Sequence, residues 1–222
     1  MIRLDSRFIT LGDCFAQRFA APGRFRYFVV LGRRWFDTAE GTEANTYEIE
    51  VALRAAGTAQ PSQQNVLVSR SADGLVAEPG NVHIQTGDAV CWYTTDSSLQ
   101  GFSIFGDGDR FRFDSTSITG EAFYTHVFGL PGRYEWVDAN HGVVRGVVEV
   151  KQLTAATAQD RQRLFEEMKK PNLVEVSGTS VTPGVLDITV GQTVFWHVQD
   201  SPGITITDPR LLHTVNPQPL PP

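Results

Sequence analysis

A carboxylate and an imidazole stand three positions apart at Asp138 and His141, a spacing that lets both side chains reach one metal ion. With a third ligand such as His126 or Gln100 they could bind zinc, which accepts histidine nitrogen and carboxylate oxygen as ligands. The alternative is that Asp138 hydrogen-bonds the backbone of its own loop and that His141 is an ordinary turn residue. We favour this alternative, so no metal ion and no other cofactor is expected. Asp138, His141 and His126 remain the candidates for a metal site.

The two cysteines, Cys14 and Cys91, form neither a metal-ligand spacing nor the set of several pairs that marks a disulfide framework. Reduced thiols are therefore the expectation. Nothing in the sequence shows that the two residues meet. If the protein is exported they could pair, so their oxidation state stays open.

Other patterns of catalytic residues are missing from the sequence. It contains no Ser-His-Asp order, no Cys-His pair and no glycine-rich phosphate loop. The acidic stretch around Asp107, Asp109 and Asp114 has the dense oxygen ligands of a calcium loop, but it lacks the glycine and the final glutamate of an EF-hand. We interpret it as a solvated loop and expect the protein not to be an enzyme.

Aromatic, arginine and leucine residues offer a different kind of site. In the segment 32–45, two arginines precede a tryptophan and a phenylalanine, and exposed Trp and Arg are enriched at protein-binding hot spots. The same residues could instead close the end of a sandwich core. Apolar residues at one outer position of two repeated strands, and two leucines before a proline-rich tail, are further candidates. The predicted partner-binding residues are Arg33, Arg34, Trp35, Phe36, Cys91, Phe195, Leu211 and Leu212.

The composition limits the partners. The chain has 222 residues, a hydrophobic fraction of 41%, a charged fraction of 20% and a net charge of −6, as in an ordinary globular protein. The acidic balance argues against nucleic acid, and no apolar run approaches the roughly 20 residues of a membrane span. The N-terminal stretch lacks the apolar core of a secretory signal, so we expect a cytoplasmic protein and leave export by another route open. The expected partners are other protein subunits, either further copies of this chain or different proteins.

Most of the chain alternates between apolar and polar residues with period two and is rich in Val, Ile, Thr and aromatics, which predicts many short β-strands. Turn signals at short intervals between them are typical of sandwiches and barrels. The segment Thr154–Lys170 is instead dense in helix formers and ends at Pro171. Its narrow apolar stripe of Leu164, Phe165 and Met168 predicts a helix on the surface.

Two stretches of the chain are repeated. Pro79–Asp96 and Pro183–Asp200 match without a gap at seven positions, each 104 residues apart. A second pair, Phe15–Phe25 and Tyr124–Tyr134, shares a frame of an aromatic, a phenylalanine, Pro-Gly-Arg and another aromatic. Such internal repeats indicate duplicated structural units. We interpret the middle of the chain as one complete unit, the N-terminus as the back half of another unit and the C-terminus as its front half.

Four short motifs follow one another in the middle unit. Residues 87–92 read Gly-Asp-x-Val-x-Trp, and residues 102–104 form the next apolar strand. Residues 124–134 contain a Pro-Gly-x-Tyr corner, and His141 precedes a closing strand at 146–150. In this order the motifs resemble the cupredoxins, a family of Greek-key β-sandwiches related to plastocyanin and azurin. The resemblance implies that the second unit, assembled from the terminal halves, has the same fold.

The resemblance also implies where a copper site would lie, and this sequence departs from it there. Blue-copper sites use two histidines, a cysteine thiolate and a weak axial group such as methionine. Of the family's positions only His141 matches: the first histidine position falls near Leu99, the cysteine position falls at Asp138, and no methionine follows. The other unit has no Cys, His or Met at its corresponding positions. The copper ligands are therefore lost.

The expected fold class is all-β, with two cupredoxin-like Greek-key β-sandwiches, one complete in the middle of the chain and one assembled from its ends, plus one linking α-helix. Each half alone would expose strand edges, so the terminal halves should complete each other. We favour completion within one chain, because the local concentration is high, over completion between chains. The expected segments are a back half at 1–58, a complete unit at 62–151, a linker helix at 152–171, a front half at 172–210 and an extended proline-rich tail at 211–222.

The expected function is that of a non-catalytic structural or interaction subunit of a larger protein assembly. One alternative is a metal-binding or redox accessory protein that uses Asp138 and His141. A further alternative is a β-sandwich that binds a small ligand or a carbohydrate at its ends, because sandwiches host many functions.

Overall fold

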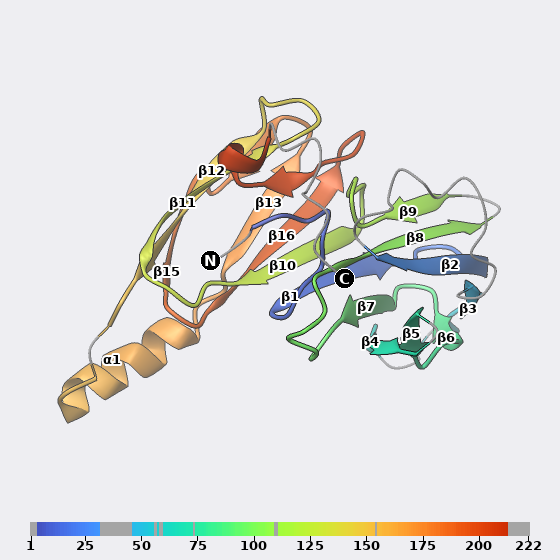
Figure 1. The fold of residues 1–222 in the computed structure, drawn as a ribbon, viewed down its shortest axis with the longest axis horizontal. Coiled ribbons are helices and arrows are strands. Elements are labelled where there is room, and N and C mark those ends of the chain that lie inside the picture. Colours follow the sequence, from blue (N-terminus) through green and yellow to red (C-terminus); the bar gives the residue numbers. More distant parts are fainter. Residues whose placement is uncertain are drawn as a thin grey trace.

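The alternation of apolar and polar residues produces a mostly β structure (Figure 1). The computed structural model describes residues 4–31, 46–55, 57, 60–72, 74–108, 111–153 and 155–212. Within these residues the chain forms three sheets and one α-helix, α1 (Ala158–Met168). The expectation of a β protein with one helix is confirmed at this level. No helix in the described ranges is both long enough and apolar enough to cross a membrane.

We call the part of the chain from β1 to β9 the first unit. A five-stranded sheet in the order β6-β3-β2-β8-β9 packs there against β1, β7, β4 and β5. Tyr27 and Trp92 bridge the two layers with ring centroids 5.4 Å apart. The strands are β1 (Asp13–Arg18), β2 (Gly23–Leu31), β3 (Thr46–Ala52), β4 (Gln63–Ser71), β5 (Gly74–Glu78), β6 (Val82–Gln85), β7 (Ala89–Tyr93), β8 (Phe102–Gly108) and β9 (Arg112–Asp114).

The second unit runs from β10 to β17 and repeats this arrangement. A four-stranded sheet in the order β15-β12-β11-β17 packs against β10, β16, β13 and β14, with Trp136 and Trp196 in contact between the layers at 6.1 Å. The strands are β10 (Ala122–Val127), β11 (Gly132–Asp138), β12 (Arg145–Lys151), β13 (Leu173–Ser177), β14 (Ser180–Thr182), β15 (Val185–Thr189), β16 (Thr193–Asp200) and β17 (Ile206–Thr207).

One eight-stranded sheet joins the two units, in the order β14-β13-β16-β10-β1-β7-β4-β5. Read outward from its centre, the order is β1-β7-β4-β5 on one side and β10-β16-β13-β14 on the other. At the centre β1 and β10 are antiparallel, and Phe15 lies opposite Tyr124. Because these two residues hold the same place in the sequence repeat, the units are related by a local two-fold axis, as in an isologous dimer interface.

The strand pairing differs from the expected grouping of the repeated halves. Strands β1, β2 and β3 pair with β7, β8 and β6, which belong to the middle of the chain. Strands β10, β11 and β12 pair with β16, β17 and β15, so the terminal halves complete the middle rather than each other. The chain is thus a tandem repeat of two contiguous units. The repeats fit either grouping, but a half closes at lower entropic cost onto the half that follows it directly.

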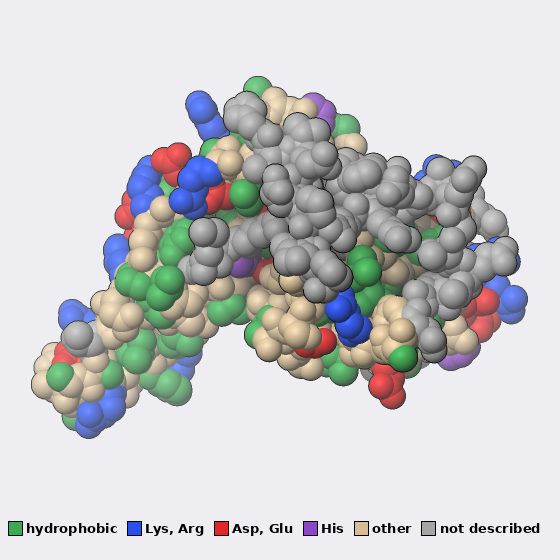
Figure 2. Space-filling model, in the orientation of Figure 1, with side chains coloured by type: hydrophobic (Ala, Val, Ile, Leu, Met, Phe, Trp, Pro, Cys, Tyr) green, Lys and Arg blue, Asp and Glu red, His purple; other side chains and the backbone are tan. Residues whose placement is uncertain are grey.

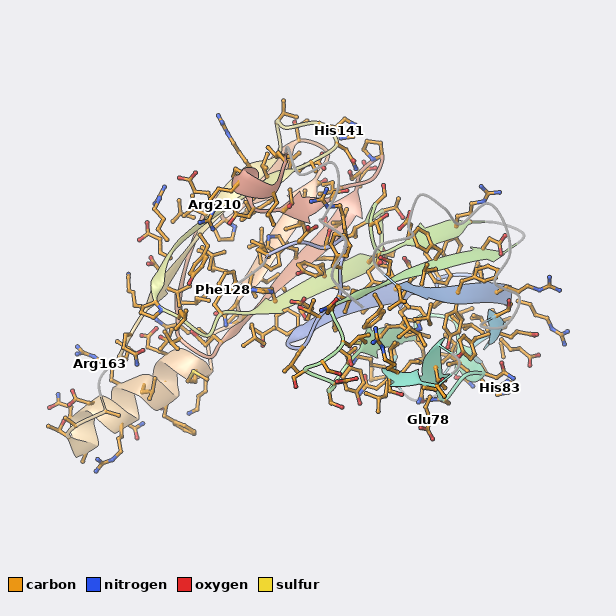
Figure 3. All side chains as sticks on the ribbon, viewed as in Figure 1. Glu78, His83, Phe128, His141, Arg163 and Arg210 are labelled. Carbon is orange, nitrogen blue, oxygen red and sulfur yellow. The ribbon has the colours of Figure 1, made fainter. Side chains whose placement is uncertain are left out.

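Aromatic residues fill both cores at matching positions. Trp92 and Trp196 are fully buried, and Val90 and Val194 are buried beside them, as the alternation along their strands predicts. Phe128 lies in the interior of the second unit, 6.4 Å from Trp196 (Figure 3). Each unit therefore has an aromatic core built from the repeated strands.

The tight turns before β7 and β16 need glycine. Gly87 and Gly191 have φ values of 93° and 90°, a region that side chains disfavour. Next to them, Asp88 and Gln192 each accept a backbone hydrogen bond from the residue three positions earlier, at 2.9 and 2.6 Å. The repeat keeps the turn geometry while the accepting group changes from a charged carboxylate to a neutral amide.

Helix α1 lies in the linker between β12 and β13, and Figure 1 shows it projecting from one end of the second unit. A capping box starts the helix, because the Thr157 hydroxyl accepts the Asp160 N–H at 3.1 Å and the Asp160 carboxylate accepts the Thr157 N–H at 2.9 Å. No residue of the helix is buried, which confirms the predicted surface helix. The matching linker of the first unit, residues 53–62, contains no helix in its described part.

The segment before β1 crosses to the second unit. Asp5 forms an antiparallel bridge with Thr207 of β17. The backbone N–H of Asp208 donates to the carbonyl of Leu4 at 2.9 Å. The start of the described chain therefore pairs with its far end.

Candidate functional site

Asp138 ends strand β11 and is fully buried. Its Oδ1 accepts the backbone N–H groups of Asn140 and Thr205 at 3.0 and 2.9 Å. Its Oδ2 accepts the backbone N–H of His141 at 3.1 Å and lies 2.8 Å from His141 Nδ1. These contacts hold the turn after β11 and attach it to the segment before β17, which is the structural role that the loop interpretation of Asp138 describes.

Of the three metal candidates, Asp138 and His141 are in contact, and His126 lies elsewhere. His126 Nδ1 is 2.6 Å from Asp13 Oδ1 at the junction of the units, and both residues are buried. His141 lies at the end of the second unit that is remote from helix α1 (Figure 3). Among the described residues, no group of three or more His, Cys, Asp or Glu side chains could hold a metal ion. The structure therefore does not bring Asp138, His141 and His126 together.

Of the predicted partner-binding residues near the chain ends, the structure describes the two leucines but not residues 33–36. Leu211 ends a short 3-10 segment, η2 (Pro209–Leu211), and Leu212 follows it; both are half-buried. Leu212 lines a cavity of about 600 Å³ together with Trp136 and Gly146. The two leucines thus pack at one end of the second unit. Outside the described residues lie Arg33, Arg34, Trp35 and Phe36.

Cys91 and Phe195 hold matching positions on β7 and β16 but have different surroundings. Phe195 is 44% exposed, which agrees with the prediction of an apolar residue on the outer face. Cys91 is only 5% exposed, so the prediction that it offers a binding surface is wrong. Its strand lies between β1 and β4, where Ala16 and Asn65 flank it. The side chains of these neighbouring strands cover a residue as small as cysteine, whereas a phenylalanine ring stands above its neighbours.

The exposed Phe195 lines a groove of about 450 Å³ on the outer face of the second unit. Phe123 on β10 and Leu173 on β13 contribute to the sheet side of the groove, and Met168 and Pro171 form its wall at the end of helix α1. Lys170 is the one titratable residue in this lining. The groove can therefore offer apolar contact and one positive charge, but no acid-base pair.

Polar and aromatic contacts fix the two walls of this groove. Gln192 Nε2 donates to the backbone carbonyl of Glu167 at 3.0 Å and ties the end of the helix to the turn before β16. On the sheet side, the rings of Phe123 and His197 stack with centroids 4.2 Å apart and an interplanar angle of 4°. Contacts within the fold thus hold both walls of the groove in place.

Helix α1 adds exposed apolar surface next to the groove. Phe165 is 58% exposed and Met168 is 46% exposed. The Lys169 ammonium lies 4.2 Å from the centre of the Phe165 ring. Figure 2 shows acidic and basic side chains mixed over the visible face of the second unit.

Phe123 and His197 are not among the site residues predicted from the sequence, and the contact of Cys14 with Cys91 was left open there. Alternation from the buried Tyr124 places Phe123 on the outer face of its strand, so part of the signal was present. Which strands lie beside β10 depends on long-range pairing with β16 and β1, and the period of the sequence does not report that pairing.

No protein-family model matches the chain, and no curated protein or solved structure is detectably similar to it.

Proposed function

We propose that this protein is a non-catalytic interaction protein and that the groove beside helix α1 is its binding surface. The observation that carries the proposal is a helix without any buried residue next to a groove lined by exposed and half-buried apolar side chains. Helices shorter than about 12–15 residues are marginal in water unless an apolar face packs against something. A contiguous exposed apolar patch is also typical of an interaction site.

The partner that we propose is a second copy of this chain. One molecule presents both parts of a helix-in-groove contact, an apolar helix stripe and an apolar groove. A two-fold arrangement, in which the helix of each copy enters the groove of the other, satisfies both surfaces at once. Glu166 and Glu167 in the last turn of the helix pair with Lys169 and Lys170 just past its end, so this surface carries both signs of charge.

We also propose that both units have a cupredoxin-like fold. In its favour are the packing of two sheets in each unit, the Pro-Gly corners and the buried tryptophans on matching strands. The position that a copper-binding cysteine would take holds Asp138, whose carboxylate is used by backbone N–H groups. On this proposal the fold serves as a scaffold for binding rather than as a copper carrier.

Light scattering on the purified protein over a wide range of concentrations tests the proposal. We expect a monomer–dimer equilibrium that Phe195→Ser and Met168→Ser each shift toward the monomer. Val143→Ser is the matched control, because Val143 is 63% exposed on the same unit but does not line the groove. A monomer at every concentration would refute the second copy as partner, and an equal shift by the control would refute the groove as the contact.

A further inference from the structure

Two cysteines 77 positions apart in sequence meet across neighbouring strands. Cys14 lies on β1 opposite Tyr93, and Cys91 lies on β7 opposite Ala16, so the cysteines are diagonal neighbours on one face of the sheet. Their sulfur atoms are 3.0 Å apart. A disulfide has a sulfur–sulfur distance of about 2.05 Å, so the two atoms must approach by only about 1 Å to bond.

The two thiols differ in access and in acidity. Cys14 is half-buried, whereas Cys91 is buried. The Cys91 thiol donates a hydrogen bond to the Cys14 sulfur and lowers the pKa of Cys14, and this effect outweighs the burial of Cys14. The same hydrogen bond, together with burial, raises the pKa of Cys91. Because the thiolate is the nucleophile, Cys14 is suited to attack an external disulfide first. Cys91 is placed to attack the Cys14 sulfur in the second step.

We propose that Cys14 and Cys91 form a reversible disulfide by exchange with a low-molecular-weight disulfide such as oxidised glutathione. The Cys14 thiolate attacks one sulfur of the oxidant, forms a mixed disulfide and expels one glutathione thiolate. Cys91 then loses its proton to that thiolate or to solvent, attacks the Cys14 sulfur and expels the second glutathione thiolate. Two protein thiols are oxidised to one disulfide, and one glutathione disulfide is reduced to two thiols.

The position of the pair connects this chemistry to the architecture. Strand β1 pairs with β7 on one side and with β10 of the second unit on the other. The backbone N–H of Cys14 also donates to the Thr125 hydroxyl of β10 at 3.1 Å. The disulfide therefore forms on the strand that joins the two units. Because Cys14 stays partly exposed, an external thiol can attack its sulfur and reopen the bond. The cysteine pair lies in the first unit and does not line the groove of the second unit.

Intact mass and thiol alkylation of the full chain test the proposal. After reduction and then treatment with oxidised glutathione, the wild-type protein should lose the mass of two hydrogen atoms, retain no glutathione and show no alkylatable thiol once denatured. Dithiothreitol should restore both thiols. Cys91→Ser, which lacks the second thiol, should instead retain one glutathione on Cys14. Cys14→Ser should react at least several-fold more slowly, because its remaining thiol is buried.

Three results would overturn the proposal. The first is a wild-type protein that keeps two alkylatable thiols in excess oxidant, and the second is a stable glutathione adduct in place of the disulfide. The third is a bound metal ion that a chelator removes and that protects both thiols. All three are read on the wild-type chain, so the test holds even if a serine variant fails to fold.

Discussion

The first unit has two cysteines where the second unit has two phenylalanines. Cys14 and Cys91 correspond in the repeat to Phe123 and Phe195, and each pair consists of diagonal neighbours on the outer face of the shared sheet. The two thiols lie against each other, with Cys91 buried and Cys14 half-buried. The half-buried Phe123 and the exposed Phe195 instead line a groove together with the end of helix α1. The same two positions of one fold thus hold two thiols in contact in one unit and part of a groove lining in the other.

The turns before β7 and β16 show the same divergence. In the first unit the turn is held by Asp88, which is paired with Arg54 and also accepts hydrogen bonds from Ser62. In the second unit the neutral Gln192 holds the turn and reaches helix α1. The backbone is repeated, while the chemistry on it is specific to each unit.

The largest effect on stability is expected from the buried tryptophan that each unit has in its core. Trp92→Ala and Trp196→Ala each remove a fully buried indole and should each lower the free energy of unfolding by about 3–5 kcal/mol. Urea denaturation followed by circular dichroism measures both. A cost below about 1 kcal/mol at one site would mean that the two cores are not packed alike.

The second-largest effect is expected at the junction of the two units, where Asp13 contacts His126. Asp13→Ala removes the carboxylate 2.6 Å from the buried His126 ring, and a buried polar group without its partner costs about 1–3 kcal/mol. We expect amide hydrogen exchange to accelerate in both β1 and β10, since the pair joins them. Glu135→Ala, at an exposed carboxylate, is the control and should change neither strand. Faster exchange in β1 alone would contradict the coupling of the units.

Low pH should weaken the turn held by Asp88 but not the turn held by the neutral Gln192. Burial opposes ionisation of Asp88, but hydrogen bonds from Ser62 and Gln85 and the nearby Arg54 charge outweigh it, so the pKa of Asp88 is lowered. Its contribution to stability is fully present above about pH 3.9, the pKa of an unfolded aspartate, and is lost as the pH falls through the lower folded pKa.

Asp88→Asn should therefore cost about 1 kcal/mol at neutral pH and should flatten the stability curve at acid pH. The measurement is the free energy of unfolding across a pH series. Parallel curves for the variant and the wild-type protein would show that the carboxylate of Asp88 does not distinguish its turn from the Gln192 turn.

The smallest effect is expected from helix α1, which has no counterpart among the described residues of the first unit. Thr157→Ala removes the N-cap of helix α1, which is worth about 1 kcal/mol to the helix itself. Because no helix residue is buried, hydrogen exchange should accelerate across residues 158–168 while the melting temperature stays nearly constant. An equal loss of global stability would show that the helix packs on the body of the unit.

Local patterns predicted the local structure well. Period two located most strands, the helix-forming stretch located α1, and alternation placed Trp92 and Trp196 in the cores. The grouping of the halves was not predictable, because two copies of each half leave open which copies pair. The contact of Cys14 with Cys91 was missed for the same reason, since it exists only because β1 lies beside β7. The exposure of Phe195 and the cover over Cys91 likewise depend on side-chain size among neighbours that only the assembled sheet brings together.

The bridge between Asp5 and Thr207 makes the connectivity of the molecule nearly circular. A short linker between the two ends of the described chain, combined with a new opening between β9 and β10, would preserve every sheet while exchanging the order of the units. The position of the chain ends therefore decides which unit comes first in the sequence, and it does not change the arrangement of the sheets. The architecture itself has no first and last unit, only two neighbours around one axis.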